Sequence, residues 1–591
     1  MKTGIGALGL LALLSPGDQA LAPPAFDPLF EPGAATCAPP ARPGQLLLAL
    51  AAAPKPRTET APFTPQPMLA APGVVPRYRN LGHLSYPLGR EKPQAQAYFD
   101  QGLRLAFAFN HAEAQRAFQA AQRLDPGCAL CHWGEAWVLG PNINAPMTPE
   151  AQAPALAALA RAVALKDGLP AAQRGLIAAL TQRYSVDPQA ERPALDAAFA
   201  DALQALAAQH PRDDLIQVLS AEAAMNTQPW DYWQAAGAEP KGRTAYFVPA
   251  LEAVLKRNPQ HAGAIHLYIH AVEASTRPER ALAPARRLAA QMPGAGHIVH
   301  MPGHIYFRVG LYREALQANK KAIAVDEAYF KTSPSDPMYR SAYYPHNIHF
   351  LMVSAQMGGD AATALQAAAK LDDALAPEVV SAIAALQPLK AAPFSIHALF
   401  SPPEQVLQLA APPAEWVLVR ALHLHARALA QVRLGRLVEA RQEIDALQQL
   451  EAQADFKPFD AWGVPAAAIV QTARLVATAR LAEAQGDAEA AGRAYEAAVA
   501  VEDALPYTEP PHWYHPVRQS LGALRLRQGR LEEAEAALRA SLQRTRHNGW
   551  ALAALAEVYR LKGDRSAAQA TRMALARSWF GPGKGPDLAR L

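Results

Sequence analysis

Cysteine, aromatic residues and charge of one sign are all scarce in this chain. Three cysteines in 591 residues exclude a fold built on disulfide bridges. The 56 Lys and Arg residues nearly balance the 52 Asp and Glu residues, and no basic stripe is interleaved with aromatic residues, so we expect no nucleic-acid partner. No apolar run reaches the roughly 20 residues that cross a bilayer, so we expect no transmembrane segment.

Alanine and leucine are abundant in the chain instead. Its 591 residues are too many for one hydrophobic core. Both residues favour helices, and small alanine side chains let neighbouring helices pack closely. The composition therefore predicts an all-helical protein of several domains or of many repeats.

The first 80 residues differ from the remainder. Lys2, an apolar run over residues 5–14 and the small residues Ala20 and Ala22 predict a signal peptide over residues 1–22, so we expect export, to the periplasm in a bacterium. An apolar, disordered N-terminus is the alternative. Residues 23–76 contain 14 prolines, which disfavours helices, so residues 23–80 are predicted to form a disordered tether.

A repeat of 34 residues organises the chain beyond residue 80. Gly529 and Gly563 are 34 positions apart, and each is followed five residues later by an alanine, Ala534 or Ala568. The glycine permits a turn between two helices, and the alanine permits their close contact. A period of 34 is that of tetratricopeptide (TPR) repeats. The predicted fold is an all-α TPR-type solenoid of helical hairpins with an N-terminal array over 81–372, a Pro-rich loop or linker over 373–415 and a C-terminal array over 416–591.

Histidines follow the same period. On the 34-residue offset His266 falls on His300 and His270 falls on His304, and each pair is spaced i, i+4, so both rings leave one face of a helix. Eight of the 18 histidines lie within the 89 residues from 261 to 349. In TPR arrays such positions line the concave groove. The candidate metal ligands are His266, His270, His297, His300, His304, His346 and His349.

Imidazole groups bind zinc, copper and iron, so a transition-metal site is the first hypothesis for this set. Leu267 stands where a zinc protease of the His-Glu-x-x-His type carries its general base, which excludes that class. Glu273, one further turn along, is a candidate ligand or hydrogen-bond acceptor for a ring N–H. A groove that grips a peptide or acidic ligand, and a buried hydrogen-bond network without any ligand, are the alternatives.

Cys128, Cys131 and His132 form the sequence of a c-type haem attachment site. Haem is the weaker interpretation, because the motif crosses the junction between two repeats. We favour two buried thiols or a local disulfide instead.

Several motifs resemble a bacterial family of TPR proteins that has no assigned reaction. These motifs lie within residues 95–360 and include 229–233, 300–306 (His-Met-Pro-Gly-His-Ile-Tyr) and 343–350 (Tyr-Tyr-Pro-His-Asn-Ile-His-Phe). The resemblance implies a TPR scaffold that binds a partner protein or peptide in its concave groove, with a candidate bound metal. The alternative function is a poly-histidine metalloprotein, for example a metal-dependent oxidoreductase. No motif identifies a catalytic residue or a reaction.

Overall fold

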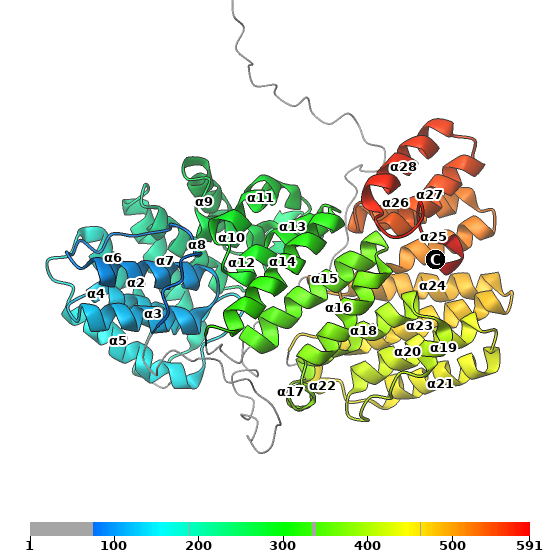
Figure 1. Ribbon diagram of the computed structural model, residues 1–591, viewed down its shortest axis with the longest axis horizontal. Helices are drawn as coiled ribbons and strands as arrows, with labels where there is room; N and C mark the ends of the chain where they lie inside the picture. Colours follow the sequence, from blue (N-terminus) through cyan, green and yellow to red (C-terminus); the bar gives the residue numbers. More distant parts are fainter. Residues whose placement is uncertain (1–74, 188, 334–338, 461) are drawn as a thin grey trace, which may run out of the picture. The chain divides into compact units, whose positions relative to one another are not determined.

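The computed structural model describes residues 75–187, 189–333, 339–460 and 462–591 (Figure 1). The predicted signal peptide and residues 23–74 of the predicted tether lie outside the described residues. All described residues belong to one compact unit. They are almost entirely helical; their one small sheet pairs β1 (Trp233–Gln234) with β2 (Glu239–Pro240) in antiparallel fashion.

Helices that follow one another in sequence pack against one another along the chain. The helices before the histidine-rich segment are α2 (Pro93–Phe107), α3 (His111–Leu124), α4 (Ala129–Val138), α5 (Gln152–Ala164), α6 (Ala171–Thr181), α7 (Arg192–Gln209), α8 (Asp214–Asn226) and α9 (Thr244–Arg257). The helices of the histidine-rich segment and its flank are α10 (Ala262–Val272), α11 (Leu282–Gln291), α12 (Gly296–His300), α13 (Pro302–Arg308), α14 (Tyr312–Phe330), α15 (Tyr344–Gly358) and α16 (Ala361–Ala374).

Residues 416–591, the predicted C-terminal array, also form helical hairpins. Its helices are α20 (Val417–Arg433), α21 (Leu437–Gln453), α22 (Lys457–Asp460), α23 (Ala466–Ala484), α24 (Ala488–Ala504), α25 (Val517–Arg527), α26 (Leu531–Arg544), α27 (Gly549–Leu561) and α28 (Arg565–Ser578). Gly529 and Gly563 have φ of 73° and 78°, so they adopt the left-handed conformation at the turns where glycine was predicted. Ala534 and Ala568 are buried. The predicted all-α TPR-type solenoid is confirmed.

Residues 373–415 differ from the predicted Pro-rich loop or linker. They contain three α-helices, α17 (Pro377–Ala382), α18 (Gln387–Phe400) and α19 (Pro403–Leu407), and the 3-10 helix η5 (Ala384–Leu386). Pro377 and Pro403 occupy first turns, where the missing N–H has no helical partner in any case. The prolines that suggested a loop therefore mark helix starts, although Pro393 lies inside α18.

The last residues of the predicted tether, 75–80, are part of the folded unit. Val75 is buried, and the backbone N–H of Tyr78 donates to Gln101 Oε1 at 3.0 Å. These contacts with α2 explain why the Pro-rich composition ends in ordered structure at this point.

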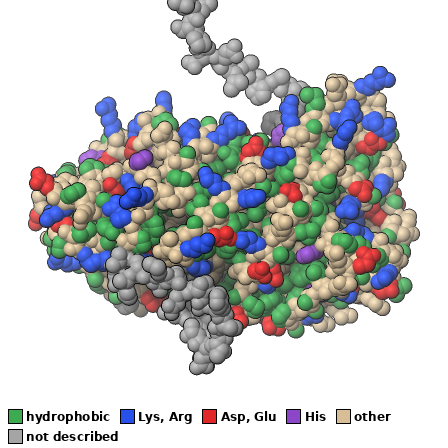
Figure 2. All heavy atoms as spheres, in the orientation of Figure 1, with side chains coloured by type: hydrophobic (Ala, Val, Ile, Leu, Met, Phe, Trp, Pro, Cys, Tyr) green, Lys and Arg blue, Asp and Glu red, His purple; other side chains and the backbone are tan. Residues whose placement is uncertain are grey.

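Two hydrophobic cores meet at α13. Ile305 belongs to the core of the preceding helices, while Phe307 belongs to the core of the following ones. Figure 2 shows acidic and basic side chains interspersed over the visible face. Among the helices described, none combines the length and the apolarity that a bilayer crossing requires.

Candidate metal centre

Six buried or half-buried histidines gather at the junction of the two cores, on helices α10, α12, α13 and α15. They form two groups of three, His266 with His270 and His297, and His300 with His304 and His346; within each group the candidate ligand nitrogens all lie within 4.8 Å of one another. The groups are neighbours, since the rings of His270 and His304 have centroids 5.6 Å apart. The structure thus brings together six of the seven predicted ligands.

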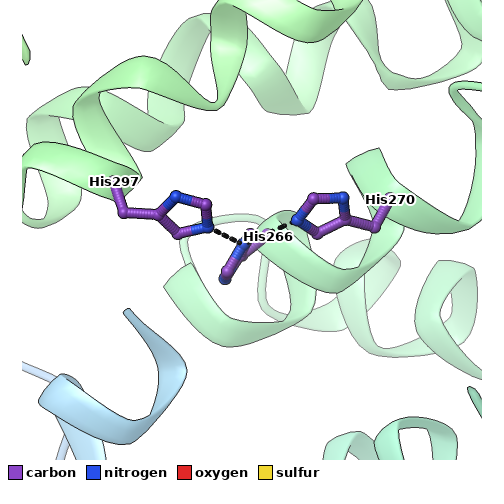
Figure 3. Close-up of side chains that lie close together, drawn as sticks. All are labelled: His266, His270 and His297. Atoms are coloured by element: carbon purple, nitrogen blue, oxygen red, sulfur yellow. Dashed lines mark hydrogen bonds between the residues drawn. The ribbon is translucent and has the colours of Figure 1, made fainter. Parts of the chain in front are cut away.

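The first cluster centres on His266. Its Nε2 lies 3.1 Å from Nε2 of His270, one turn further along α10, and 3.1 Å from Nε2 of His297 in α12. Figure 3 shows the rings of His270 and His297 pointing toward His266 from two sides. Three Nε2 atoms from two helices therefore share one small volume.

The second cluster spans a break between helices. Pro302 begins α13 immediately after α12 ends at His300, so His300 and His304 lie on either side of this break. Their Nε2 atoms are 2.7 Å apart, and Nε2 of His346 in α15 lies 3.5 Å from that of His304. The 34-residue offset in the sequence thus relates one i, i+4 pair in each cluster, whereas the third rings, His297 and His346, are not related by it.

The other ring nitrogen, Nδ1, is held by an acceptor in four of the six rings. Three residues supply the four acceptor atoms. His266 Nδ1 lies 2.6 Å from Phe107 O, and His300 Nδ1 lies 2.7 Å from Asn319 Oδ1. Glu273 supplies both of its oxygens, Oε1 at 2.8 Å from His270 Nδ1 and Oε2 at 2.6 Å from His304 Nδ1. The orientation of the Asn319 amide is set by its Nδ2, which donates to Ala315 O at 2.8 Å. Asn319 reaches His300 across Gly303, where a Cβ would lie 2.8 Å from Asn319 Nδ2.

These acceptors assign the tautomers. A carbonyl, an amide oxygen and a carboxylate only accept, so the ring proton sits on Nδ1 of His266, His270, His300 and His304. In the neutral rings the Nε2 lone pairs then face one another, at 3.1 Å in the first cluster and 2.7 Å in the second. Two facing lone pairs repel, and a cation held between them turns this repulsion into coordination.

His297 is the exception in the first cluster. Its Nδ1 is buried and has no hydrogen-bond partner among the described residues, so this ring is free to carry its proton on either nitrogen. As the Nε2–H tautomer it donates to His266, but one proton leaves the lone pair of His270 unpaired. The backbone N–H of His297 donates to the Tyr339 hydroxyl at 3.2 Å, which fixes the start of α12.

Glu273 connects the two clusters. Its carboxylate is fully buried and accepts from one ring of each cluster through its two oxygens. Burial alone raises the pKa of Glu273, but electrostatic interaction with His304 and the hydrogen bonds from His270 and His304 outweigh burial and lower the pKa to about 2. The structure therefore places a buried negative charge beside both clusters, and this charge favours a cation nearby.

Burial lowers the pKa of the imidazoles. The pKa values of His266, His297 and His300 fall well below 6.5, first because burial disfavours the charged form and then because neighbouring histidines repel a proton. The pKa of His346 is lowered for the same two reasons, and burial also lowers the pKa of His270. Neutral imidazole is the form that binds metals.

His349 does not join either cluster. Its Nε2 lies 2.9 Å from the Tyr514 hydroxyl of the C-terminal array. Phe350, one turn after His346, occupies the position beside the second cluster, with its ring centroid 4.7 Å from that of His304. The prediction of His349 as a ligand assumed that it shares the face of His346, and in α15 that face continues to Phe350.

Cys128 and Cys131 are joined by a disulfide at the start of α4. The bond uses the two sulfurs that haem attachment would need, and it agrees with the local disulfide among the predicted interpretations. His132 is half-buried and lies beside Glu135 and Arg161 in a separate, more open pocket, not beside the histidine clusters.

The clusters open into a cavity of about 230 Å³. The cavity is lined by His270, His297, His304 and His346 and by residues of segments 385–389 and 507–514. The Tyr507 hydroxyl lies 3.4 Å from Glu273 Oε2. Residues from distant parts of the chain therefore line one cavity with the histidines, and the concave binding groove stays a prediction.

Sequence reasoning missed Asn319, Tyr507 and Glu509. Glu509 accepts from Tyr507 at 2.7 Å and reaches the histidine region from more than 200 residues further along the chain. No period or short spacing connects these residues to the histidines. The same segment also brings His512 and Tyr514 into the lining of the cavity.

No protein-family model matches the chain, and no curated protein matches it. Among solved structures the chain is similar to three helical-repeat proteins. They are the human IFIT1 dimer with m7Gppp-AAAA (12% identity, 84% of this chain and 91% of that chain, TM-score 0.28), the APC/C hetero-tetramer Cut9–Hcn1 (12%, 82% and 73%, 0.27) and the P58(IPK) TPR domain (13%, 80% and 99%, 0.20). At these identities and TM-scores, the ligands and partners of the three proteins cannot be assigned to this chain.

Proposed function

We propose that this chain is a metalloprotein on a TPR-type scaffold, which holds two transition-metal ions in adjacent tri-histidine sites. One observation carries the proposal: in each cluster two imidazoles have Nδ1 committed to an acceptor, so their Nε2 lone pairs face each other at 3.1 Å and 2.7 Å. Glu273 adds a buried carboxylate that orients one ring in each cluster, as outer carboxylates do in metal sites.

The donor set favours copper or zinc. All six candidate ligands are imidazoles, while the non-haem iron sites of oxygenases include a directly bound carboxylate. Glu273 has both oxygens occupied by ring N–H groups, so it supports the ligands rather than joining them. Three protein ligands leave a coordination position open, and the cavity beside both clusters gives that position access to a small molecule. The geometry therefore supports a reactive metal centre over a purely structural one.

Metal analysis of the untagged protein tests this proposal. The protein is stripped with a chelator, reconstituted separately with copper and zinc, and freed of excess metal before mass spectrometry. We expect close to two ions per chain. A metal content at the level of a control protein after both reconstitutions overturns the proposal and leaves protonated histidine pairs as the explanation.

Binding of a protein or peptide partner remains a prediction from the repeat architecture. Segment 507–514 lies over the histidines, so such a partner would bind another surface of the scaffold. Export also remains a prediction, because residues 1–22 lie outside the described part of the chain. The expectation of no nucleic-acid partner rests on charge distribution alone.

A further inference from the structure

Two kinds of side chain line the cavity beside the histidine clusters. The apolar ones include Leu386, Leu389 and Val464 together with Trp230 and Tyr514. The others include four histidines of the two clusters. Small-molecule sites combine such a mainly apolar lining with a few polar groups that orient the ligand.

Glu509 supplies the polar group at the edge of this cavity. Its Oε1 accepts from the Tyr507 hydroxyl at 2.7 Å and lies 3.8 Å from Arg308 Nε. Its Oε2 is buried and has no hydrogen-bond partner among the described residues, and its side chain is only 4% exposed. A buried acceptor without a donor is destabilising, so this oxygen favours a ligand that donates a hydrogen bond.

The size of the cavity limits the ligand to a single substituted ring. A cavity of about 150 Å³ is known to hold benzene, and this one measures about 230 Å³. Aromatic side chains on the wall, Trp230 and Tyr514 among them, provide ring faces and edges for an aromatic ligand. In the metal-free protein the buried carboxylate of Glu273 disfavours an anionic ligand.

We propose that this cavity binds a small hydroxylated aromatic molecule, a phenol, with its hydroxyl donating to Glu509 Oε2 and its ring beside the histidine clusters. The assignment of this phenol as the substrate class of the metal centre rests on the proposed function. Binding itself depends only on the cavity and on Glu509.

Calorimetry with three probes of one size tests the proposal. The probes are 4-methylphenol, toluene and 4-methylbenzoate, each titrated into metal-loaded and metal-free protein. We expect 4-methylphenol to bind at least about tenfold more tightly than toluene, because only the phenol donates to Glu509. We expect 4-methylbenzoate not to bind the metal-free protein, because the buried carboxylate of Glu273 repels it there. Equal affinities for the phenol and toluene, or no binding of either, overturn the proposal.

Two variants locate the site. Glu509→Leu removes the acceptor, so the preference for 4-methylphenol over toluene should fall to about onefold. Leu389→Trp fills the cavity and should abolish binding of both probes. Persisting phenol preference in the first variant, or unchanged binding in the second, contradicts the assignment. If circular dichroism shows that Glu509→Leu is unfolded, Leu389→Trp and the benzoate comparison decide the matter.

Metal content measured on the same samples separates this inference from the proposed function. Two ions per chain without phenol binding overturn the inference and leave the metal centre standing. Phenol binding in a protein that takes up no metal overturns the metal centre and reduces the cavity to a binding site.

Discussion

The histidines of the two arrays occupy different environments although both are buried. In the C-terminal array, His425 on α20 has Nδ1 2.8 Å from Ala473 O and packs its ring against Trp513. Burial lowers its pKa to about 4. In the two histidine clusters, four of the six rings also have an acceptor at Nδ1, but their Nε2 atoms face other imidazoles.

This difference separates a packing histidine from a candidate ligand. Burial and a lowered pKa occur in both arrays and therefore do not identify a site. The clusters differ from such packing histidines because Nε2 lone pairs of several rings point toward one another. Acceptors at Nδ1 fix the tautomers of these rings. A protein interior tolerates one such ring with a partner, while facing lone pairs require a cation or a proton.

The largest expected effect is the loss of one metal ion. In the double variant His300→Ala/His304→Ala, the second cluster keeps only His346, so the content should fall from about two ions per chain to about one. His425→Ala is the matched control, since it removes a buried histidine outside the clusters. Mass spectrometry of reconstituted protein measures both. Equal metal content in the double variant and the control would contradict the distinction between the arrays.

Glu273→Gln should weaken both sites at once. The amide cannot accept from two ring N–H groups as the carboxylate does, and it removes the buried negative charge. Changes to such outer partners cost about 10- to 100-fold in metal affinity. Competition with a chelating dye measures this affinity, with Glu502→Gln, a buried carboxylate in α24 whose pKa burial raises to about 7, as the control. A loss confined to one cluster would show that Glu273 does not connect them.

Substitutions at two turn glycines should lower the free energy of unfolding by different amounts. Gly359, which follows α15, and Gly529, which follows α25, both have positive φ, but a Cβ on Gly359 would lie 2.2 Å from the Trp579 ring, while a Cβ on Gly529 meets nothing within 4 Å. Gly529→Ala should lower the free energy of unfolding by about 1–2 kcal/mol through backbone strain. Gly359→Ala should cost about 1–3 kcal/mol more through crowding. Urea denaturation measures both, and equal losses would contradict the crowding.

The smallest effect is expected at the disulfide. Cys128→Ala/Cys131→Ala opens a loop that spans only three positions in sequence, so the stability loss should stay below the roughly 3 kcal/mol of a 15-residue loop. Metal content should not change, because α4 contributes no ligand. Thermal denaturation and metal analysis check these points. A visible haem band in the unaltered protein that this variant loses would restore the haem interpretation.

The 34-residue period and the i, i+4 spacing were sufficient to predict the solenoid and four of the six histidines that meet, while His297 and His346 were placed by their positions within TPR helices. Both patterns are local, because helix geometry alone puts His266 and His270 on one face, and the repeat then places His300 and His304 equivalently. The prediction of a loop or linker at residues 373–415 from proline content was wrong. Proline is common in the first turn of a helix, so a Pro-rich segment can contain helix starts.

Only the tertiary structure decided what surrounds these histidines. It directs His349 to Tyr514, places Asn319 behind His300 and brings Glu509 to the cavity from the far array. These contacts join segments that have no common period, so nothing in the local pattern encodes them. The sequence by itself determined which rings share a helix face, and the packing of the two arrays determined which nitrogens carry a proton and which face a cation.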